Sequence, residues 1–223
     1  MDHHHRHLQL ITGATPLLTD DGFARIVAAM RAGVDSVQIR ERNATAKLVL
    51  EVAQRLLVPA SESGTVITIN DRADVALALL PQRLPTRRAG GCLVPIGVHL
   101  GGQSLPVDLV RRNLPLPLIG VSVHSLEEAR AAARDGADYV TFGHVNPSRS
   151  HPGVPPRGVD QLAAVVAEVD IPVFAIGGID FDNVSEVLAS GCAGIAVISA
   201  ISNACDPGFA TARLRAALDQ EVT

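Results

Sequence analysis

Short runs of β-branched and other apolar residues alternate along the chain with longer stretches that are rich in alanine and leucine. Alternation of this kind predicts repeated βα units and a parallel sheet. The predicted strands are Leu8–Thr12, Ser36–Arg40, Val66–Asn70, Ile96–Leu100, Leu118–His124, Tyr139–Gly143, Ile171–Ile176 and Gly194–Ser199. Barrels of eight such units often span about 200–250 residues as one domain. We therefore predict an α/β protein, a single (β/α)₈ TIM-barrel domain over residues 1–223.

Local signals for helix ends agree with this division. Ser125 and Glu128 have the spacing of a capping box, and Gly136 stands where the helix after them should stop. Pro207 is placed for the first turn of the last helix. The main alternative is an open doubly wound sheet, but the residues after the first strand lack its glycine-rich fingerprint.

Two segments rich in proline, glycine and arginine interrupt the rhythm. Pro81–Pro95 lies between a helix and the following strand, which places it on the N-terminal face of a barrel. His144–Gly158 follows the sixth strand, so we expect it on the C-terminal face as a lid over the active site. Residues 1–7 are histidine-rich, and we expect them to form a disordered N-terminus.

Composition narrows the class of protein. Apolar residues make up 47% of the chain, which is enough for a large core, and the net charge of −4 gives no basic footprint for nucleic acid. No signal peptide and no apolar stretch long enough to span a membrane is apparent, so we expect a cytoplasmic protein. Cys92, Cys192 and Cys205 have no regular spacing, and we expect them to be small buried side chains in a reducing compartment.

Functional residues of such barrels lie at the C-terminal ends of the strands. By strand alternation, Gln38 and Arg40 share a face that points into the barrel. An arginine there is costly unless it meets an anion. Arg40 therefore predicts either a contact to an anionic ligand or an internal ion pair, for instance with Glu41.

Three further strand ends carry polar groups. Asn70 and Asp71 could orient a ring or hold a cation, although Asp71 could instead cap the next helix. Ser122 and His124 point the same way into the barrel. An imidazole at the rim suits proton transfer, while the alternative is a histidine bonded into the loop network.

The last two strands predict a phosphate site. Gly177 and Gly178 follow the seventh strand, and Ser199 follows the eighth. Paired glycines let the backbone approach a ligand closely, and these two loops form the common phosphate site of barrels. Two tight turns without a ligand are the alternative.

Five segments together resemble the thiamine-phosphate synthase superfamily, in the right order and over nearly the whole chain. They are Gln38–Arg42, Ile69–Arg72, Gly97–Gly101, Ala175–Ile179 and Ala196–Ile201. The superfamily has two main branches. The synthase joins an aminopyrimidine diphosphate to a thiazole phosphate with Mg²⁺, whereas the thiazole tautomerase (TenI-like) aromatises the thiazole phosphate carboxylate by moving a proton.

Three positions depart from the synthase pattern that the resemblance implies. Arg42 stands in place of a lysine, Ser104 in place of a second Mg²⁺-binding aspartate, and His151 in place of a lysine in the lid. Arg149 or Arg42 could substitute in part. Loss of a metal carboxylate and of the lid lysine counts against a reaction that must release diphosphate.

The resemblance therefore implies the tautomerase, an isomerase, with His124 as the catalytic acid and base and no cofactor. Mg²⁺, with Asp71 as its ligand, is expected only if the protein is a divergent synthase. The expected ligand-binding residues are Gln38, Arg40, Arg42, Asn70, Ser122, His144, Gly177, Gly178, Ile198 and Ser199. A third possibility is a non-catalytic barrel that binds a thiazole or thiamine phosphate and regulates a partner. We expect a small phosphorylated ligand, no nucleic acid or membrane partner, and allow for a homo-oligomer.

Overall fold

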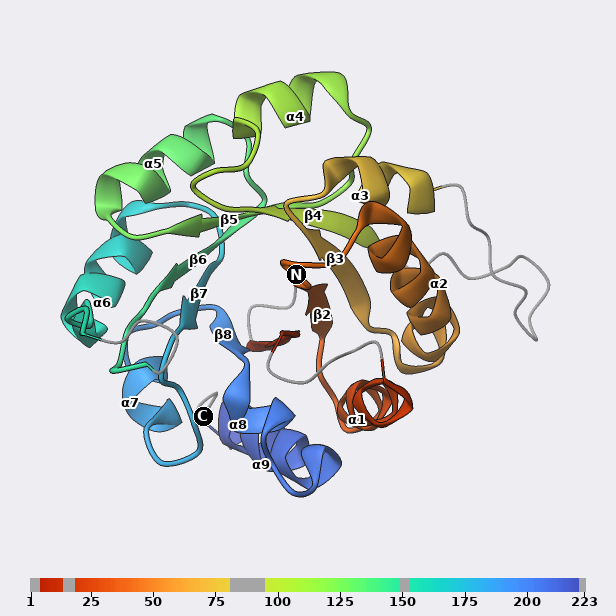
Figure 1. Cartoon of the computed structure of the whole chain (residues 1–223). Helices are drawn as coiled ribbons and strands as arrows, with labels where there is room; N and C mark the ends of the chain where they lie inside the picture. Colours follow the sequence, from red (N-terminus) through yellow and green to blue (C-terminus); the bar gives the residue numbers. More distant parts are fainter. Residues whose placement is uncertain (1–4, 14–18, 81–94, 149–152, 221–223) are drawn as a thin grey trace.

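In the computed structural model, parallel strands pair in chain order and the last lies beside the first, so that they close a barrel (Figure 1). The structure describes residues 5–13, 19–80, 95–148 and 153–220. The strands are β1 (His7–Ile11), β2 (Ser36–Ile39), β3 (Val66–Asn70), β4 (Ile96–Leu100), β5 (Ile119–Val123), β6 (Tyr139–Gly143), β7 (Val173–Ile176) and β8 (Gly194–Val197). Pairing of Gln9 with Ala196 closes the ring between β1 and β8. The predicted (β/α)₈ barrel is therefore confirmed.

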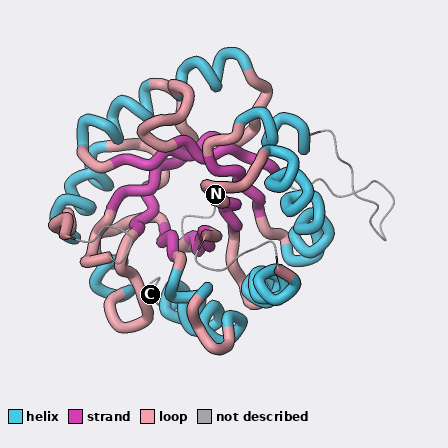
Figure 2. The backbone as a smooth tube through the Cα atoms, viewed as in Figure 1, coloured by secondary structure: helices cyan, strands magenta, loops and turns pink. Residues whose placement is uncertain are grey.

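Helices lie outside the ring of strands, as Figure 2 shows in cyan around magenta. They are α1 (Asp20–Arg31), α2 (Ala46–Ser63), α3 (Ala73–Leu79), α4 (Val107–Asn113), α5 (Leu126–Arg134), α6 (Gly158–Glu168), α7 (Val184–Leu188), α8 (Ser199–Ser202) and α9 (Pro207–Gln220). Strand residues such as Val37 and Ile39 are buried against this layer. Their neighbour Gln38 is buried too, and alternation turns it to the inside of the barrel.

The local signals for helix ends are confirmed. The hydroxyl of Ser125 accepts a hydrogen bond from the backbone N–H of Glu128 at 3.1 Å. Gly136 has a φ of +96°, a left-handed conformation that ends the chain's helical path after α5. Pro207 is the first residue of α9.

Several strands begin or end one to two residues away from the predicted bounds, because a proline or the next helix limits them. The seventh strand starts at Val173 rather than Ile171, because Pro172 has no N–H to give to the ladder. The eighth ends at Val197, because Ser199 already belongs to α8.

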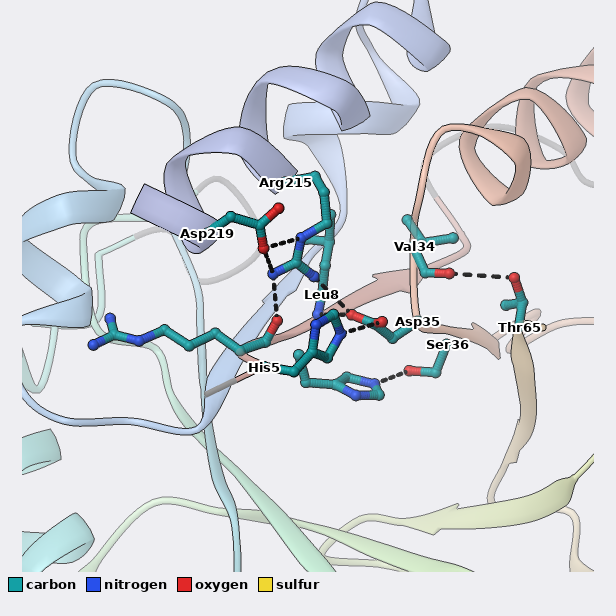
Figure 3. Close-up of polar contacts among 10 residues, drawn as sticks. His5, Leu8, Val34, Asp35, Ser36, Thr65, Arg215 and Asp219 are labelled. Carbon is teal, nitrogen blue, oxygen red and sulfur yellow. Dashed lines mark hydrogen bonds and ion pairs between the residues drawn. The ribbon is translucent and has the colours of Figure 1, made fainter. Parts of the chain in front are cut away.

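A polar cluster ties the first strand to the last helix, as Figure 3 shows. The Asp35 carboxylate accepts from the backbone N–H of Leu8 at 2.7 Å and pairs with Arg215 of α9 at 3.0 Å. Arg215 also donates to the carbonyl of Arg6 at 2.6 Å, and His5 contacts Asp35. The expectation of a disordered segment over residues 1–7 is therefore wrong for residues 5–7, which these bonds and β1 hold in place; residues 1–4 lie outside the described part.

The cysteines follow the prediction only in part. Cys192 is buried, whereas Cys205 is exposed in the turn before α9, so the expectation of a buried side chain is wrong for Cys205. Cys92 and most of the Pro81–Pro95 segment lie outside the described residues. In the described part of the chain, no helix is both long and apolar enough to cross a bilayer.

Candidate functional site at the C-terminal mouth of the barrel

A cavity of about 640 Å³ opens at the C-terminal ends of the strands. Several strands and their following loops contribute polar groups to its wall. The polar lining includes Gln38, Arg40, Glu41, Arg42, Asn70, Asp71, Arg72, His99, Gln103, Ser104, Ser122, His124, Thr141, His144 and Ser148. This is the end of the barrel at which active sites of this fold are built.

Thr12, at the end of β1, holds the end of β2 in place. Its hydroxyl accepts from the backbone N–H of Arg40 at 2.9 Å and donates to the carboxylate of Glu41 at 2.8 Å. Deeper in the mouth, the side-chain amide of Gln38 donates to the Asn70 side-chain oxygen at 2.9 Å. The bond between Gln38 and Asn70 joins these two predicted residues on the cavity wall.

The Arg40 side chain is half-buried in the mouth, and no ion pair to Glu41 or to any other acid is found among the described residues. Burial first, and the nearby Arg42 second, lower the pKa of Arg40. Two cations facing one cavity repel each other, and an anionic ligand would relieve this. Of the two interpretations of Arg40, the geometry favours the ligand contact over the internal ion pair.

The carboxylates in the mouth are few. Asp71 is exposed at the rim with a φ of +65°, a conformation that is uncommon for a residue with a side chain. It does not cap α3, whose N-cap residue Arg72 also makes no side-chain capping bond. The Ser104 hydroxyl accepts from the backbone N–H of Gly101 at 2.7 Å.

Mg²⁺ is usually held by one or two carboxylates together with substrate phosphates. Here Asp71 stands without a second carboxylate at position 104, and Glu41 is bonded to Thr12. Among the described residues, no group of three or more His, Cys, Asp or Glu side chains gathers. The donor set therefore fits a protein-held Mg²⁺ poorly.

His124 lies on the exposed rim of the cavity, one residue beyond β5. Its Nδ1 is 2.7 Å from the carbonyl oxygen of Gly143, the last residue of β6. A carbonyl oxygen only accepts, so Nδ1 carries the proton and Nε2 of the neutral ring has the lone pair. Arg157 donates to the same carbonyl at 3.0 Å. The arrangement sets His124 in one tautomer, with a base at Nε2.

His99, from β4, is buried at the bottom of the mouth. Its Nε2 lies 2.9 Å from the Ser122 hydroxyl, and its Nδ1 lies 3.0 Å from the hydroxyl of Tyr139. Burial first, and the charge of Arg40 second, lower the pKa of His99 to about 3. His99 is therefore neutral at physiological pH, and its ring bridges two hydroxyl groups.

The base of the predicted lid packs onto the paired glycines. Val145 and Asn146 donate backbone hydrogen bonds to the carbonyls of Ile176 and Gly177 at 2.9 and 3.0 Å. A Cβ atom on Gly177 would overlap His144, and one on Gly178 would overlap the carbonyl of Pro147. Close packing of the lid base thus requires glycine at positions 177 and 178, whether or not a ligand phosphate also binds there.

The two ends of the lid meet. The Arg157 N–H donates to the carbonyl of His144 at 2.9 Å, and Gly158 donates to Val145 at 3.1 Å. Nε2 of His144 contacts the carbonyl of Val154 at 3.2 Å, so this ring spans the base of the loop. Positions 149–152, which include Arg149 and His151, lie outside the described residues.

Most of the residues predicted for the site line this one cavity, including Ile198. Gly178 and Ser199 are exceptions: they adjoin Gly177 and Ile198 but do not form its wall. The sequence interpretation missed Thr12 and His99 as site residues. Strand alternation from Gly97 predicts that His99 points into the barrel. It does not predict at which depth in the barrel the side chain lies.

Fold and site together define a barrel with a cation-lined cavity at its C-terminal mouth. A family model described as thiamine monophosphate synthase matches residues 8–201, and the chain belongs to this family.

Curated relatives agree. A thiamine-phosphate synthase of Anaeromyxobacter dehalogenans is 42% identical over 212 residues, 94% of this chain and 86% of the relative. One of Roseiflexus castenholzii is 39% identical over 190 residues, 84% of this chain and 77% of the relative. The solved thiamine phosphate pyrophosphorylase of Pyrococcus furiosus is 34% identical, with a TM-score of 0.81 over 99% of this chain and 98% of that one. These names favour the synthase over the tautomerase within the family.

Proposed function

We propose that this member of the family is a thiazole tautomerase, which aromatises a thiazole phosphate carboxylate by proton transfer. The observation that carries the proposal is the bond from Nδ1 of His124 to the carbonyl of Gly143, at 2.7 Å. It leaves Nε2 as a base on the wall of a cavity lined by Arg40 and Arg42.

The ligand's two anionic ends would be held on opposite sides of the mouth. Arg40, with Arg42 beside it, would contact the carboxylate, because a guanidinium binds a carboxylate through two parallel N–H donors. The loops after β7 and β8 would hold the phosphate, with Gly177 and Ile198 on the cavity wall and the adjoining Gly178 and Ser199 supplying further backbone and hydroxyl donors. This places the ring between the arginines and the phosphate loops.

The chemical step is then one proton removed and one delivered. Nε2 of His124 takes a proton from the ring carbon, the electron pair moves through the ring, and the exocyclic carbon receives a proton from the same nitrogen. The product is the aromatic thiazole. A positioned acid and base contributes about 10²–10⁴-fold to such a step. No group leaves, so the reaction needs no metal to neutralise a departing charge.

The second candidate is a divergent thiamine-phosphate synthase, and the names of relatives at 39–42% identity favour it. Its substrates would be an aminopyrimidine diphosphate and a thiazole phosphate, and Mg²⁺ would shield the departing diphosphate. Asp71 is the residue that would hold the metal. The hydroxyl of Ser104, already bonded to Gly101, supplies no second charge.

Two assays on the purified chain separate the candidates. Incubation of the non-aromatic thiazole carboxylate phosphate in deuterated water should give the aromatic product, with solvent deuterium on the exocyclic carbon to the extent that Nε2 of His124 exchanges its proton with solvent before delivery. Incubation with aminopyrimidine diphosphate, thiazole phosphate and Mg²⁺ should release no diphosphate. Diphosphate release without tautomerisation would establish the synthase instead, and ligand binding with neither reaction would identify a non-catalytic regulatory barrel.

A further inference from the structure

A line of buried polar side chains crosses the interior of the barrel beneath the cavity. The amide nitrogen of Gln9 lies 3.3 Å from the Tyr139 hydroxyl. That hydroxyl lies 3.0 Å from Nδ1 of His99, whose Nε2 lies 2.9 Å from the hydroxyl of Ser122. Gln9, His99 and Tyr139 are each less than 5% exposed, whereas Ser122 is half-buried on the cavity wall.

The direction of these bonds follows from the chemistry of their ends. The amide nitrogen of Gln9 can only donate, so the Tyr139 oxygen accepts from it. The Thr68 hydroxyl also faces Tyr139, but it makes no hydrogen bond by distance and angle. Among the described residues, the hydroxyl hydrogen of Tyr139 then has one acceptor within hydrogen-bond geometry, Nδ1 of His99. The opposite tautomer of His99 would leave this buried hydrogen with no acceptor in hydrogen-bond geometry, which is costly.

A neutral imidazole that accepts at Nδ1 carries its proton on Nε2. The His99 ring therefore donates to the oxygen of Ser122. The Thr141 hydroxyl lies 3.4 Å from both this oxygen and Nε2 of His99. Because Nε2 carries a proton and cannot accept, Thr141 donates to Ser122 as a second donor. With donors on this side, the hydrogen of the Ser122 hydroxyl is directed away from the chain of bonds and toward the cavity.

We propose that Gln9, Tyr139 and His99 are positioning residues that make Ser122 a fixed hydrogen-bond donor, selecting a ligand that presents an acceptor atom at the inner end of the cavity. This deepens the proposed function and rests on it only for the identity of the ligand, since the polarity itself belongs to the free protein. A carboxylate oxygen or an unprotonated ring nitrogen satisfies Ser122. An N–H group at the same place would meet another donor.

Packing holds the line of bonds in one geometry. The Tyr139 ring lies against the backbone of Gly120, where a Cβ atom would overlap it. It also packs on Phe174 with ring centroids 5.0 Å apart. Burial keeps His99 neutral, since its pKa is lowered to about 3. The ring therefore has a single proton to place over the whole neutral range of pH.

The first test reads the tautomer of His99 in the free protein. Long-range proton–nitrogen correlation spectra of protein labelled with ¹⁵N-histidine distinguish a protonated Nε2 from a protonated Nδ1, and the His99→Gln variant assigns the signal. We expect protonated Nε2 in His99 across the neutral range. Protonated Nδ1, or exchange between the two forms, overturns the proposal regardless of what the protein catalyses.

The second test is a double-mutant cycle on the affinity for the aromatic thiazole carboxylate phosphate, measured by calorimetry. Tyr139→Phe and Ser122→Ala should each weaken binding about tenfold, the value of one hydrogen bond. The double variant should also lose about tenfold, because Tyr139 acts only through Ser122. Additive losses of about 100-fold, or unchanged affinity in Tyr139→Phe, overturn the proposal. Absence of binding by the unmodified protein contradicts the proposed function, while the spectrum still decides the polarity.

Discussion

The Nδ1 atom of His124, one residue beyond β5, lies 2.7 Å from the carbonyl oxygen of Gly143 at the end of the neighbouring strand β6. This contact orients the imidazole and leaves Nε2 as the base at the rim of the cavity. Because it comes from the backbone of a neighbouring strand, the orientation survives changes in most side chains around it.

Replacement of His124 by glutamine removes the base and keeps a polar side chain of similar length. We expect turnover of the thiazole carboxylate phosphate to fall about 10²–10⁴-fold, with affinity for the aromatic product nearly unchanged. Steady-state kinetics and calorimetry measure the two quantities. His5→Gln, an exposed histidine at the opposite end of the barrel, is the matched control. Turnover like that of the unmodified enzyme would remove His124 from the mechanism.

Arg40→Gln removes the half-buried cation that faces the cavity. We expect affinity for the same product to fall about 10- to 100-fold, the value of a charge-assisted hydrogen bond. Stability should not fall, since the variant also relieves burial of a charge and repulsion from Arg42. Arg130→Gln, whose guanidinium pairs with Glu168 on the outer surface, should leave binding unaltered. An equal loss of affinity in both variants would mean that Arg40 acts only through the net charge of the protein and not through a direct contact with the ligand.

Ser104→Asp adds the second carboxylate that the family's synthase pattern places there. We expect millimolar Mg²⁺ to raise the melting temperature of this variant and to leave that of the unmodified protein nearly constant, because binding to the folded state alone stabilises it. Differential scanning fluorimetry measures the shift. Addition of Asp71→Asn should abolish it. An equal shift in the unmodified protein would show that Asp71 suffices for the metal.

Gly120→Ala tests the packing of the Tyr139 ring in the barrel interior. The new methyl group would overlap the phenol, so we expect a loss of about 1–3 kcal/mol or more in the free energy of unfolding. Urea denaturation measures it. Gly102→Ala is the matched control, since nothing lies within 4 Å of its Cβ position. A loss of similar size in the control would point to backbone flexibility rather than overlap.

The stability of the protein should fall on acidification through its buried histidines. Burial lowers the pKa of His99 to about 3 and that of His7 to about 4, whereas both bind a proton below about pH 6.5 in the unfolded chain. The unfolded state then holds more protons, so the free energy of unfolding is highest above about pH 6.5 and falls as pH drops toward 4.

Each buried histidine adds a slope of up to about 1.4 kcal/mol per pH unit in this window. Urea titrations at about pH 7 and about pH 5 should therefore show a smaller loss in His99→Gln than in the unmodified protein, and His7 should contribute to the loss that remains. Equal losses in the two proteins would mean that His99 titrates alike in the folded and unfolded states.

The barrel and its helix ends could be predicted from sequence because their signals are local. The apolar run in Gly194–Ser199 and the spacing of Ser125 and Glu128 each depend on a few adjacent residues. The strand ends then brought Gln38, Arg40, Ser122 and His124 to one mouth, as alternation predicts.

Side-chain contacts between different strands could not be predicted in the same way. The bond from Thr12 to Glu41 and the bridge by His99 depend on the register of neighbouring strands, which no single segment encodes. The paired glycines gave an ambiguous signal for the same reason. Two adjacent glycines indicate that either a ligand or another part of the chain approaches the backbone closely. Only the assembled barrel identifies His144 and Pro147 as the close neighbours.

The link from Arg215 to Asp35 and Arg6 has a consequence for how the chain is made. The first strand can pair with β2 early, but it emerges from the ribosome long before β8 and α9, so its ladder with β8 and the bond from Arg215 to Arg6 form only after those elements are made. Until then the growing chain is an open sheet with two unpaired edges. Truncation before β8 should therefore expose these edges and yield aggregated nascent protein.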